Sequence, residues 1–136
     1  MDQGVNETAA GRSLRRVALV SGIYDLLLAV PLLVAAPEVA RLMGGPPPAP
    51  VVNAQLNGLF TLTLALGYLW AARAPLERRG YLWIAGVFAK GLGAMLFIGD
   101  HFLRGSPASF LLFAVTDGTL AAWTLVALLR ARGTRS

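Results

Sequence analysis

The chain has 136 residues, of which 56% are hydrophobic and 14% are charged, with a formal net charge of +5. Soluble proteins carry about 25% charged residues, so this composition excludes an ordinary soluble domain and indicates an integral membrane protein. The sequence has no cysteine and one histidine, His101, which excludes disulfide bonds, thiolate metal sites and a bis-histidine haem within one chain. We therefore expect no cofactor and no metal.

Four windows of the chain are each long and apolar enough to cross a bilayer. A membrane-spanning helix needs about 20 mostly apolar residues, and such windows lie at residues 17–36, 54–72, 81–103 and 109–129. Together they use most of the chain and leave no room for a separate soluble domain. We predict an all-α fold with one transmembrane domain at 13–130, a disordered cytoplasmic tail at 1–12 and a basic cytoplasmic tail at 131–136.

The first window and the segment after it predict two different kinds of helix. Pro31 has no backbone N–H, so we expect a kink in the outer half of the first span. Residues 37–45 place Val39, Leu42 and Met43 at helical spacing. This spacing predicts a short helix that lies in the outer membrane interface between the first and second spans.

The connections between the windows are short. The run GGPPPAP at 44–50 is expected to form a stiff, extended connector, because each proline restricts itself and the residue before it. Residues 73–80 and 104–107 join the remaining spans. Short connections place successive helices antiparallel, so we predict an up-down four-helix bundle.

Basic residues are concentrated on one side of the predicted membrane. Nine of the twelve Lys and Arg residues precede the first window, lie between the second and third, or follow the fourth: Arg12, Arg15, Arg16, Arg73, Arg78, Arg79, Arg130, Arg132 and Arg135. Positive charge in short loops marks the cytoplasmic face. We predict a multi-pass protein of the cell inner membrane with both termini in the cytoplasm. Because this topology accounts for the charge, we expect no nucleic acid as a partner.

Three ionisable residues lie inside the predicted spans. At about 1.5 Å per residue from the cytoplasmic ends, Asp25 lies about 12 Å deep, Lys90 about 13 Å and Asp117 about 18 Å. A charge in hydrocarbon costs about 2.5 to 3.5 kcal/mol, so such residues normally face the protein interior and find partners. We therefore predict that Asp25, Lys90 and Asp117 form one polar cluster near the membrane midplane.

Small residues share a helical face with each of these charges. They are Ser21, Gly22 and Ala29 for Asp25, Gly86, Gly93 and Ala94 for Lys90, and Ala114, Ala121 and Thr124 for Asp117. Small residues let neighbouring helices approach closely, so these faces are expected to point inward. In the second window one face carries Asn53, Asn57, Thr61, Ala65 and Tyr68. We expect Asn57 and Thr61 to join the cluster.

The sequence leaves three roles open for this cluster. In the first, the cluster binds a small or amphipathic ligand or passes protons. In the second, it only fixes helix register in a non-catalytic accessory or scaffold subunit of a membrane complex. In the third, it belongs to a membrane enzyme that acts on a lipid-soluble substrate. No Walker loop, GxSxG elbow, HExxH or dinucleotide pattern occurs, so catalysis has the least support. The chain is short for a two-repeat transporter, so besides membrane lipid we expect a second copy or a membrane subunit as a partner.

A family resemblance is carried by the stretches SGIYDLLLAVPLLVAAPEVARLMGGPPP, NGLFTLTLALGYLWAARAP and GVFAKGLGAMLF and by the Asp117-Gly118 pair. Over residues 21–128 the chain resembles a family of small bacterial four-span membrane proteins, loosely DoxX-like in layout. Its most distinctive positions here are Asp25, Asn57 and Lys90. The resemblance implies a four-helix integral membrane protein and implies no particular substrate.

Overall fold

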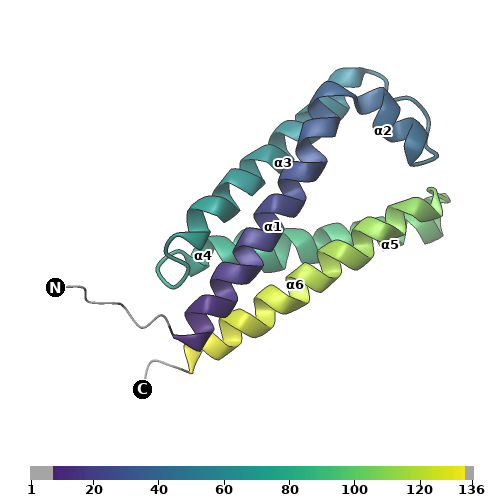
Figure 1. Ribbon diagram of the computed structural model, residues 1–136. Helices are drawn as coiled ribbons and strands as arrows, with labels where there is room; N and C mark the ends of the chain where they lie inside the picture. The colour runs from purple at the N-terminus through teal and green to yellow at the C-terminus, as the bar shows by residue number, and fades with distance from the viewer. Residues whose placement is uncertain (1–7, 134–136) are drawn as a thin grey trace.

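The computed structural model describes residues 8–133 of the 136-residue chain and confirms the all-α class, with no strand in this range. Its elements are α1 (Ala9–Val34), α2 (Ala36–Leu42), α3 (Val51–Ala72), α4 (Arg79–Tyr81), the π-helix η1 (Leu82–Ala89), α5 (Lys90–Arg104), the 3-10 helix η2 (Ala108–Phe110) and α6 (Leu111–Arg132). Since α4, η1 and α5 follow one another without a break, they form one helical rod (Figure 1).

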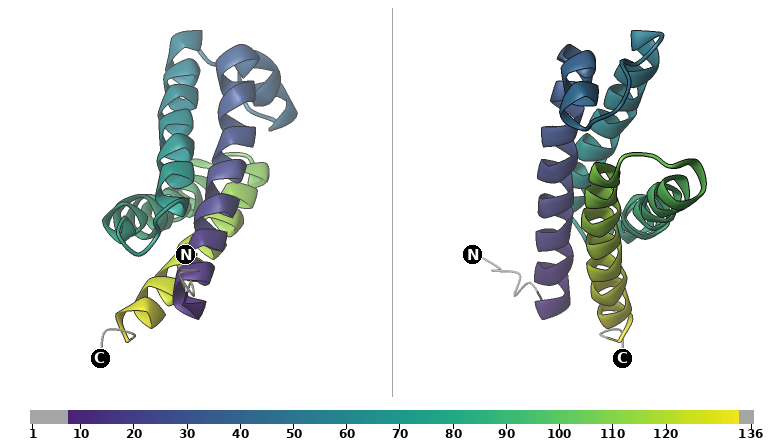
Figure 2. Two further views of the ribbon diagram at one scale, coloured as in Figure 1. Left: turned by 60° about the vertical axis from the view of Figure 1, so that its left-hand side comes forward. Right: turned by 90° about the vertical axis from the view of Figure 1, so that its right-hand side faces the viewer.

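The long helices form two antiparallel pairs that diverge from a common end (Figures 1 and 2). One pair is α1 with α3, and the other is the α4–η1–α5 rod with α6. The pairs meet where α1 begins and α6 ends, and they separate toward the end that carries α2. The arrangement therefore opens as a V, whereas a regular up-down bundle would keep its helices in contact along their whole lengths.

By length and composition, three segments of the described chain are able to cross a membrane. They are Ala9–Val34, Arg79–Arg104 and Ala108–Arg132. Helix α3 is not among them, because its first turns carry the amides of Asn53, Gln55 and Asn57. It nevertheless lies beside α1 along most of its length (Figure 1).

Helix α1 begins earlier than the sequence pattern predicts. The last four residues of the segment 1–12, expected above to be a disordered tail, belong to this helix, while residues 1–7 lie outside the described part. Gly11 N–H donates to Thr8 Oγ1 at 3.2 Å and caps the helix. Ala10 is buried in the same hydrophobic cluster as the end of α6, so tertiary packing extends the helix.

Helix α6 also continues beyond its predicted end at residue 129. Ala131 and Arg132, expected in the basic tail 131–136, are helical, and Ala131 is buried in the hydrophobic core. Its burial against the start of α1 explains why the helix continues. The last three residues of the chain lie outside the described part.

The short helix predicted after the first span is confirmed as α2. Helix α1 runs through Pro31 to its end, and α2 then starts with Pro37 in its first turn, where a missing N–H costs nothing. Gly44 has a φ of 74° and turns the chain after α2. Helix α2 folds toward the α5–α6 connection, where Ser109 Oγ donates to Met43 O at 2.5 Å. This contact bridges the wide end of the V.

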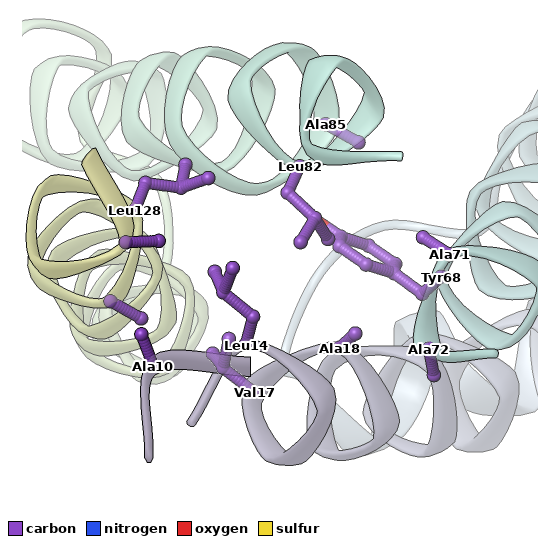
Figure 3. Packing of buried hydrophobic residues seen from close by; sticks show 12 residues of the cluster. Ala10, Leu14, Val17, Ala18, Tyr68, Ala71, Ala72, Leu82, Ala85 and Leu128 are labelled. Carbon is purple, nitrogen blue, oxygen red and sulfur yellow. The ribbon is translucent and has the colours of Figure 1, made fainter. Parts of the chain in front are cut away.

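The main hydrophobic core lies at the narrow end of the V. We call it the alanine-rich core, and it consists of Ala10, Leu14, Val17, Ala18, Tyr68, Ala71, Ala72, Leu82, Ala85, Ala127, Leu128 and Ala131. Figure 3 shows Leu14, Tyr68 and Leu82 pointing toward one another from α1, α3 and η1. Alanine lets helices approach closely, which accounts for the convergence at this end. The core closes the narrow end, and the polar site lies directly against it.

Candidate functional site

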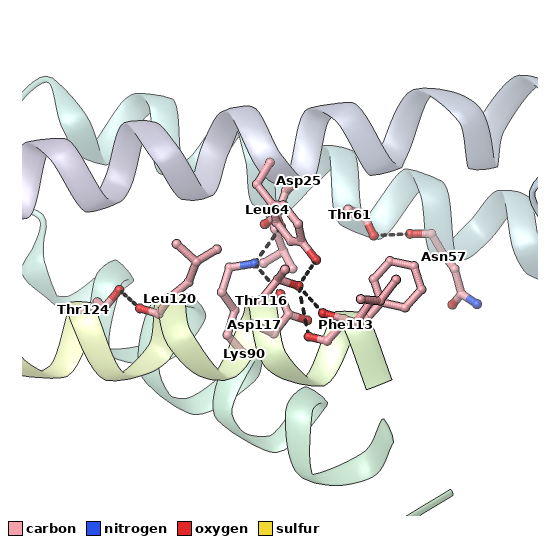
Figure 4. Close-up of polar contacts among 12 residues, drawn as sticks. Asp25, Asn57, Thr61, Leu64, Lys90, Phe113, Thr116, Asp117, Leu120 and Thr124 are labelled. Atoms are coloured by element: carbon pink, nitrogen blue, oxygen red, sulfur yellow. Dashed lines mark hydrogen bonds and ion pairs between the residues drawn. The ribbon is translucent and has the colours of Figure 1, made fainter. Parts of the chain in front are cut away.

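Lys90 lies between the carboxylates of Asp25 and Asp117 (Figure 4). Its Nζ donates to Asp25 Oδ1 at 2.6 Å and to Asp117 Oδ1 at 3.1 Å. Asp25 is only 3% exposed and Lys90 is 6% exposed, whereas the side chain of Asp117 is 17% exposed. The structure thus brings together, from α1, α5 and α6, the three charges that the sequence places at similar depth. We call these residues the charged triad.

A π-helix directly precedes Lys90 and sets its direction. The Lys90 N–H donates to Ala85 O, five positions earlier, which is the hydrogen-bond spacing of a π-helix. Gly86 brings this segment close to α6, because an added Cβ would lie 2.7 Å from Thr124 Cγ2. Helical periodicity alone did not predict this segment. π-Helical segments inside α-helices are rare and frequently occur at functional sites, and here the segment ends directly before the ammonium-bearing residue.

The small residues predicted to face inward beside the triad are buried or half-buried. Gly22 is one turn from Asp25, and an added Cβ there would lie 3.2 Å from Tyr68 Cβ, so α1 and α3 approach closely. Three buried atoms in this region have no hydrogen-bond partner among the residues that the structure describes: Ser21 Oγ, Asp25 Oδ2 and Tyr68 OH. They give the site one unused carboxylate acceptor and two hydroxyls.

Two aromatic rings border the ammonium. Lys90 Nζ lies 5.0 Å from the centre of the Tyr24 ring and 5.6 Å from that of Tyr68, within the range of cation–π attraction. The Tyr24 hydroxyl also forms a 2.5 Å hydrogen bond with Thr116 Oγ1, which links α1 to α6. The sequence pattern missed Tyr24 as part of the site, although it precedes Asp25, because neighbours in a helix point about 100° apart.

Asn57 and Thr61 are not brought to the triad. Thr61 Oγ1 donates to Asn57 O of its own helix at 2.8 Å, and the Asn57 residue is exposed. In Figure 4 both lie further along α3, and the Asn57 side chain extends away from Lys90. The cause is the divergence of the helix pairs, because this part of α3 lies toward the wide end of the V, where it packs against the end of α1.

A cavity of about 570 Å³ runs along α5, and we call it the α5 cavity. It is lined by Gly93, Met95, Leu96, Phe97, Gly99, Asp100, Leu103, Arg104 and Phe110. At one end, Arg104 Nη1 donates to Asp100 Oδ1 at 2.8 Å and forms a charged rim. At the other end, a Cβ added to Gly93 would lie 3.9 Å from Asp117 Oδ2. The α5 cavity therefore extends from a charged rim, along apolar side chains, to Gly93, which neighbours the most exposed carboxylate of the triad.

The donor types of the site suit charge and proton chemistry better than metal binding. Within residues 8–133, no three His, Cys, Asp or Glu side chains gather to hold a metal ion. Two carboxylates and one ammonium can hold a charged group or exchange a proton. No protein-family model, curated protein or solved structure matches the chain. The DoxX-like resemblance therefore stays a prediction.

Proposed function

We propose that the protein is a small multi-pass protein of a bacterial inner membrane whose charged triad binds an amphipathic ligand. Under this proposal α1, α3, the α4–η1–α5 rod and α6 all cross the bilayer, with both ends of the chain on the cytoplasmic side. Three of the four segments have the length and composition of membrane spans. Helix α3 has the length as well, with 22 residues, and its packing against α1 compensates for its lower hydropathy.

The position of Asp117 carries this proposal. Two ionised carboxylates and one ammonium leave a formal charge of minus one, and Asp117 is the member whose side chain is 17% exposed. Its Oδ2 lies beside Gly93, which lines the α5 cavity. A half-buried negative charge beside one end of an apolar cavity favours a ligand with a protonated amine or another donor head and an apolar tail. The cavity volume of about 570 Å³ is within the usual range for such sites.

The proposal also assigns a direction of entry. The alanine-rich core closes the narrow end of the V, while the α5 cavity extends toward the ion pair of Asp100 and Arg104 near the wide end. A ligand, or a proton, would therefore reach Asp117 from the side of the membrane opposite the chain ends. The unpaired Asp25 Oδ2 next to Lys90 provides a second acceptor deeper in the site.

Binding of a simple amphipathic amine tests the proposal. We expect decylamine, but not decanoic acid or decanol, to raise the unfolding midpoint of the protein in nanodiscs. Asp117→Asn should remove this effect, because a charge-assisted hydrogen bond is worth about 1.5 to 3 kcal/mol. Isothermal titration should then show decylamine binding about 10-fold or more weaker. Equal binding of the amine to the parent protein and to Asp117→Asn would refute the assignment.

A matched pair of variants separates the α5 cavity from the lipid-facing surface. Leu96 lines the cavity and Leu112 on α6 does not, and both are strongly exposed. Leu96→Trp should fill the cavity and weaken decylamine binding, while Leu112→Trp should leave it at the parent value. If Leu112→Trp weakens binding as much as Leu96→Trp, the amine binds elsewhere.

A scaffold or accessory subunit is the second candidate. It is favoured by the position of Lys90, whose ammonium is within hydrogen-bond distance of both carboxylates and needs no further partner. In that case the triad only fixes helix register, as buried polar groups do in some helical assemblies. Triad variants would then lower stability, and decylamine would have the same effect on every variant.

A further inference from the structure

We infer that a second site, between α1 and α3, binds an anionic phospholipid. A cavity of about 460 Å³ is lined by Arg15, Leu19, Leu69, Ala72 and Arg73. None of these residues belongs to the charged triad or lines the α5 cavity. The inference rests on the membrane topology of the proposed function but not on the ligand proposed for the charged triad.

Two arginines form the polar end of this cavity. Arg15 Nε donates to Ala72 O at 3.2 Å, a hydrogen bond that fixes the guanidinium across the seam between the two helices. Arg73 directly follows Ala72, the last residue of α3, and is exposed. Guanidinium groups are planar multiple donors that match the geometry of a phosphate. Two of them at one rim favour a phosphodiester.

Two leucines form the apolar part, each about one helical turn further into the molecule. Leu19 follows Arg15 by four residues on α1, and Leu69 precedes Arg73 by four residues on α3, which is about 6 Å along each helix. Leu19 is 39% exposed, so its side chain remains open to a ligand. Leu69 is held in place against Gly22, where an added Cβ would lie 3.1 Å away. An acyl chain continuing from a phosphate at the rim would lie along these side chains.

The surrounding charge selects an anionic headgroup over a zwitterionic one. The same end of the molecule carries only one acid, Glu77, within residues 8–133. It also carries six further arginines: Arg12, Arg16, Arg78, Arg79, Arg130 and Arg132. Basic cavities between membrane helices on the cytoplasmic side bind anionic headgroups, and the attraction is about fivefold in affinity per basic residue. Free phosphate would share the arginines, but it would gain nothing from the leucines.

Titration of lipid into the full-length protein in neutral detergent tests the site, with native mass spectrometry as the readout. Dioleoyl phosphatidylglycerol should bind more tightly than dioleoyl phosphatidylcholine. Inorganic phosphate and glycerol phosphate should not compete with it at equal concentration. The double variant Arg15→Gln, Arg73→Gln should bind phosphatidylglycerol about 30-fold more weakly, since two basic residues are lost. Its affinity for phosphatidylcholine should fall less, because the choline ammonium already offsets the phosphate charge in that lipid.

Two further variants keep the test decisive. Arg130→Gln with Arg132→Gln removes the same charge at the same end, outside the cavity, and should weaken binding clearly less than Arg15→Gln, Arg73→Gln does, because only the surrounding charge is lost. Leu19→Trp fills the apolar part at an exposed position and should weaken phosphatidylglycerol binding, even if the double arginine variant fails to fold. The site is refuted if the two charge pairs have equal effects, if Leu19→Trp binds normally, if phosphate competes as well as lipid, or if both lipids bind equally.

Discussion

Lys90 Nζ lies 2.6 Å from Asp25 Oδ1, although the two residues are 65 positions apart in the chain. The same ammonium lies 3.1 Å from Asp117 Oδ1, so one side chain connects α1, α5 and α6 at the point where the helix pairs begin to diverge. A buried ion pair is stabilising only while every member is present, because a remaining partner is left as an uncompensated charge.

Replacing Lys90 by methionine should therefore destabilise the fold strongly. Lys90→Met leaves the carboxylate of Asp25, which is 3% exposed, without its counter-charge. We expect a loss of about 3 to 5 kcal/mol in the free energy of unfolding. The measurement is thermal or denaturant unfolding in detergent micelles, followed by far-ultraviolet circular dichroism.

The matched control for this variant is Arg104→Met. Arg104 is also ion-paired on the same rod, with Asp100, but its side chain is 80% exposed. Its loss should cost about 0 to 1 kcal/mol. Adding Asp25→Asn and Asp117→Asn to Lys90→Met should recover part of the lost stability, because no charge then remains unpaired. Equal costs for Lys90→Met and Arg104→Met would mean that the triad is not buried.

Two glycines on the same rod should respond in opposite ways to alanine. Gly86→Ala places a Cβ 2.7 Å from Thr124 Cγ2, and overpacking of this kind costs about 1 to 3 kcal/mol. Gly91→Ala meets nothing within 4 Å and should stabilise the helix by about 0.5 to 1 kcal/mol. Unfolding midpoints of the two purified variants give the comparison directly.

A rescue variant identifies the cause of the Gly86 effect. Thr124→Ser removes Cγ2 and keeps the hydroxyl that donates to Leu120 O at 2.7 Å. Gly86→Ala combined with Thr124→Ser should therefore be more stable than Gly86→Ala alone. No gain from Thr124→Ser would show that η1 and α6 do not touch at this point.

The hydrogen bond between Tyr24 and Thr116 should contribute measurably to the contact of α1 with α6. Tyr24→Phe removes one hydroxyl, while Thr116 keeps its bond to Leu112 O at 2.9 Å. We expect a loss of about 0.5 to 1.5 kcal/mol. A double-mutant cycle with Thr116→Val should give a coupling energy of this size. Additive effects of the two substitutions would contradict the 2.5 Å contact.

Single-cysteine labelling tests whether α3 crosses the membrane. The chain has no native cysteine, so each variant reports one position. In sealed vesicles, a membrane-impermeant maleimide should label Ala49→Cys and Ala108→Cys from one side, and Glu77→Cys and Gly133→Cys from the other. If α3 does not cross, Ala49→Cys and Glu77→Cys will be labelled from the same side.

The meeting of the three charged residues could be predicted from sequence because two independent patterns agree. Depth along each helix follows from residue counting, and the inward face follows from small neighbours such as Ser21 and Gly22 beside Asp25. Both quantities are local to one helix. They suffice to identify the faces that meet, even without any information on how the helices are oriented relative to one another.

Features that depend on the relative orientation of helices could not be predicted. Asn57 lies on the same face of α3 as the buried Tyr68. The two helix pairs have already separated at the level of Asn57, so this side chain remains exposed. The π-helix before Lys90 shifts hydrogen bonds by one residue without a change in hydrophobic pattern. The early start of α1 depends on burial of Ala10 against a helix end more than one hundred residues later, which local propensity does not register.

Seven of the twelve side chains that close the narrow end of the V are alanines. An alanine side chain has no rotamers to exchange, so these seven side chains cannot swing aside to admit a solute. Passage past them requires the helix backbones themselves to move apart. Such collective motions take microseconds to milliseconds, whereas rotamer changes take about nanoseconds. Opening of the narrow end of the V is therefore expected on the time scale of helix motion and not on that of side-chain rotation.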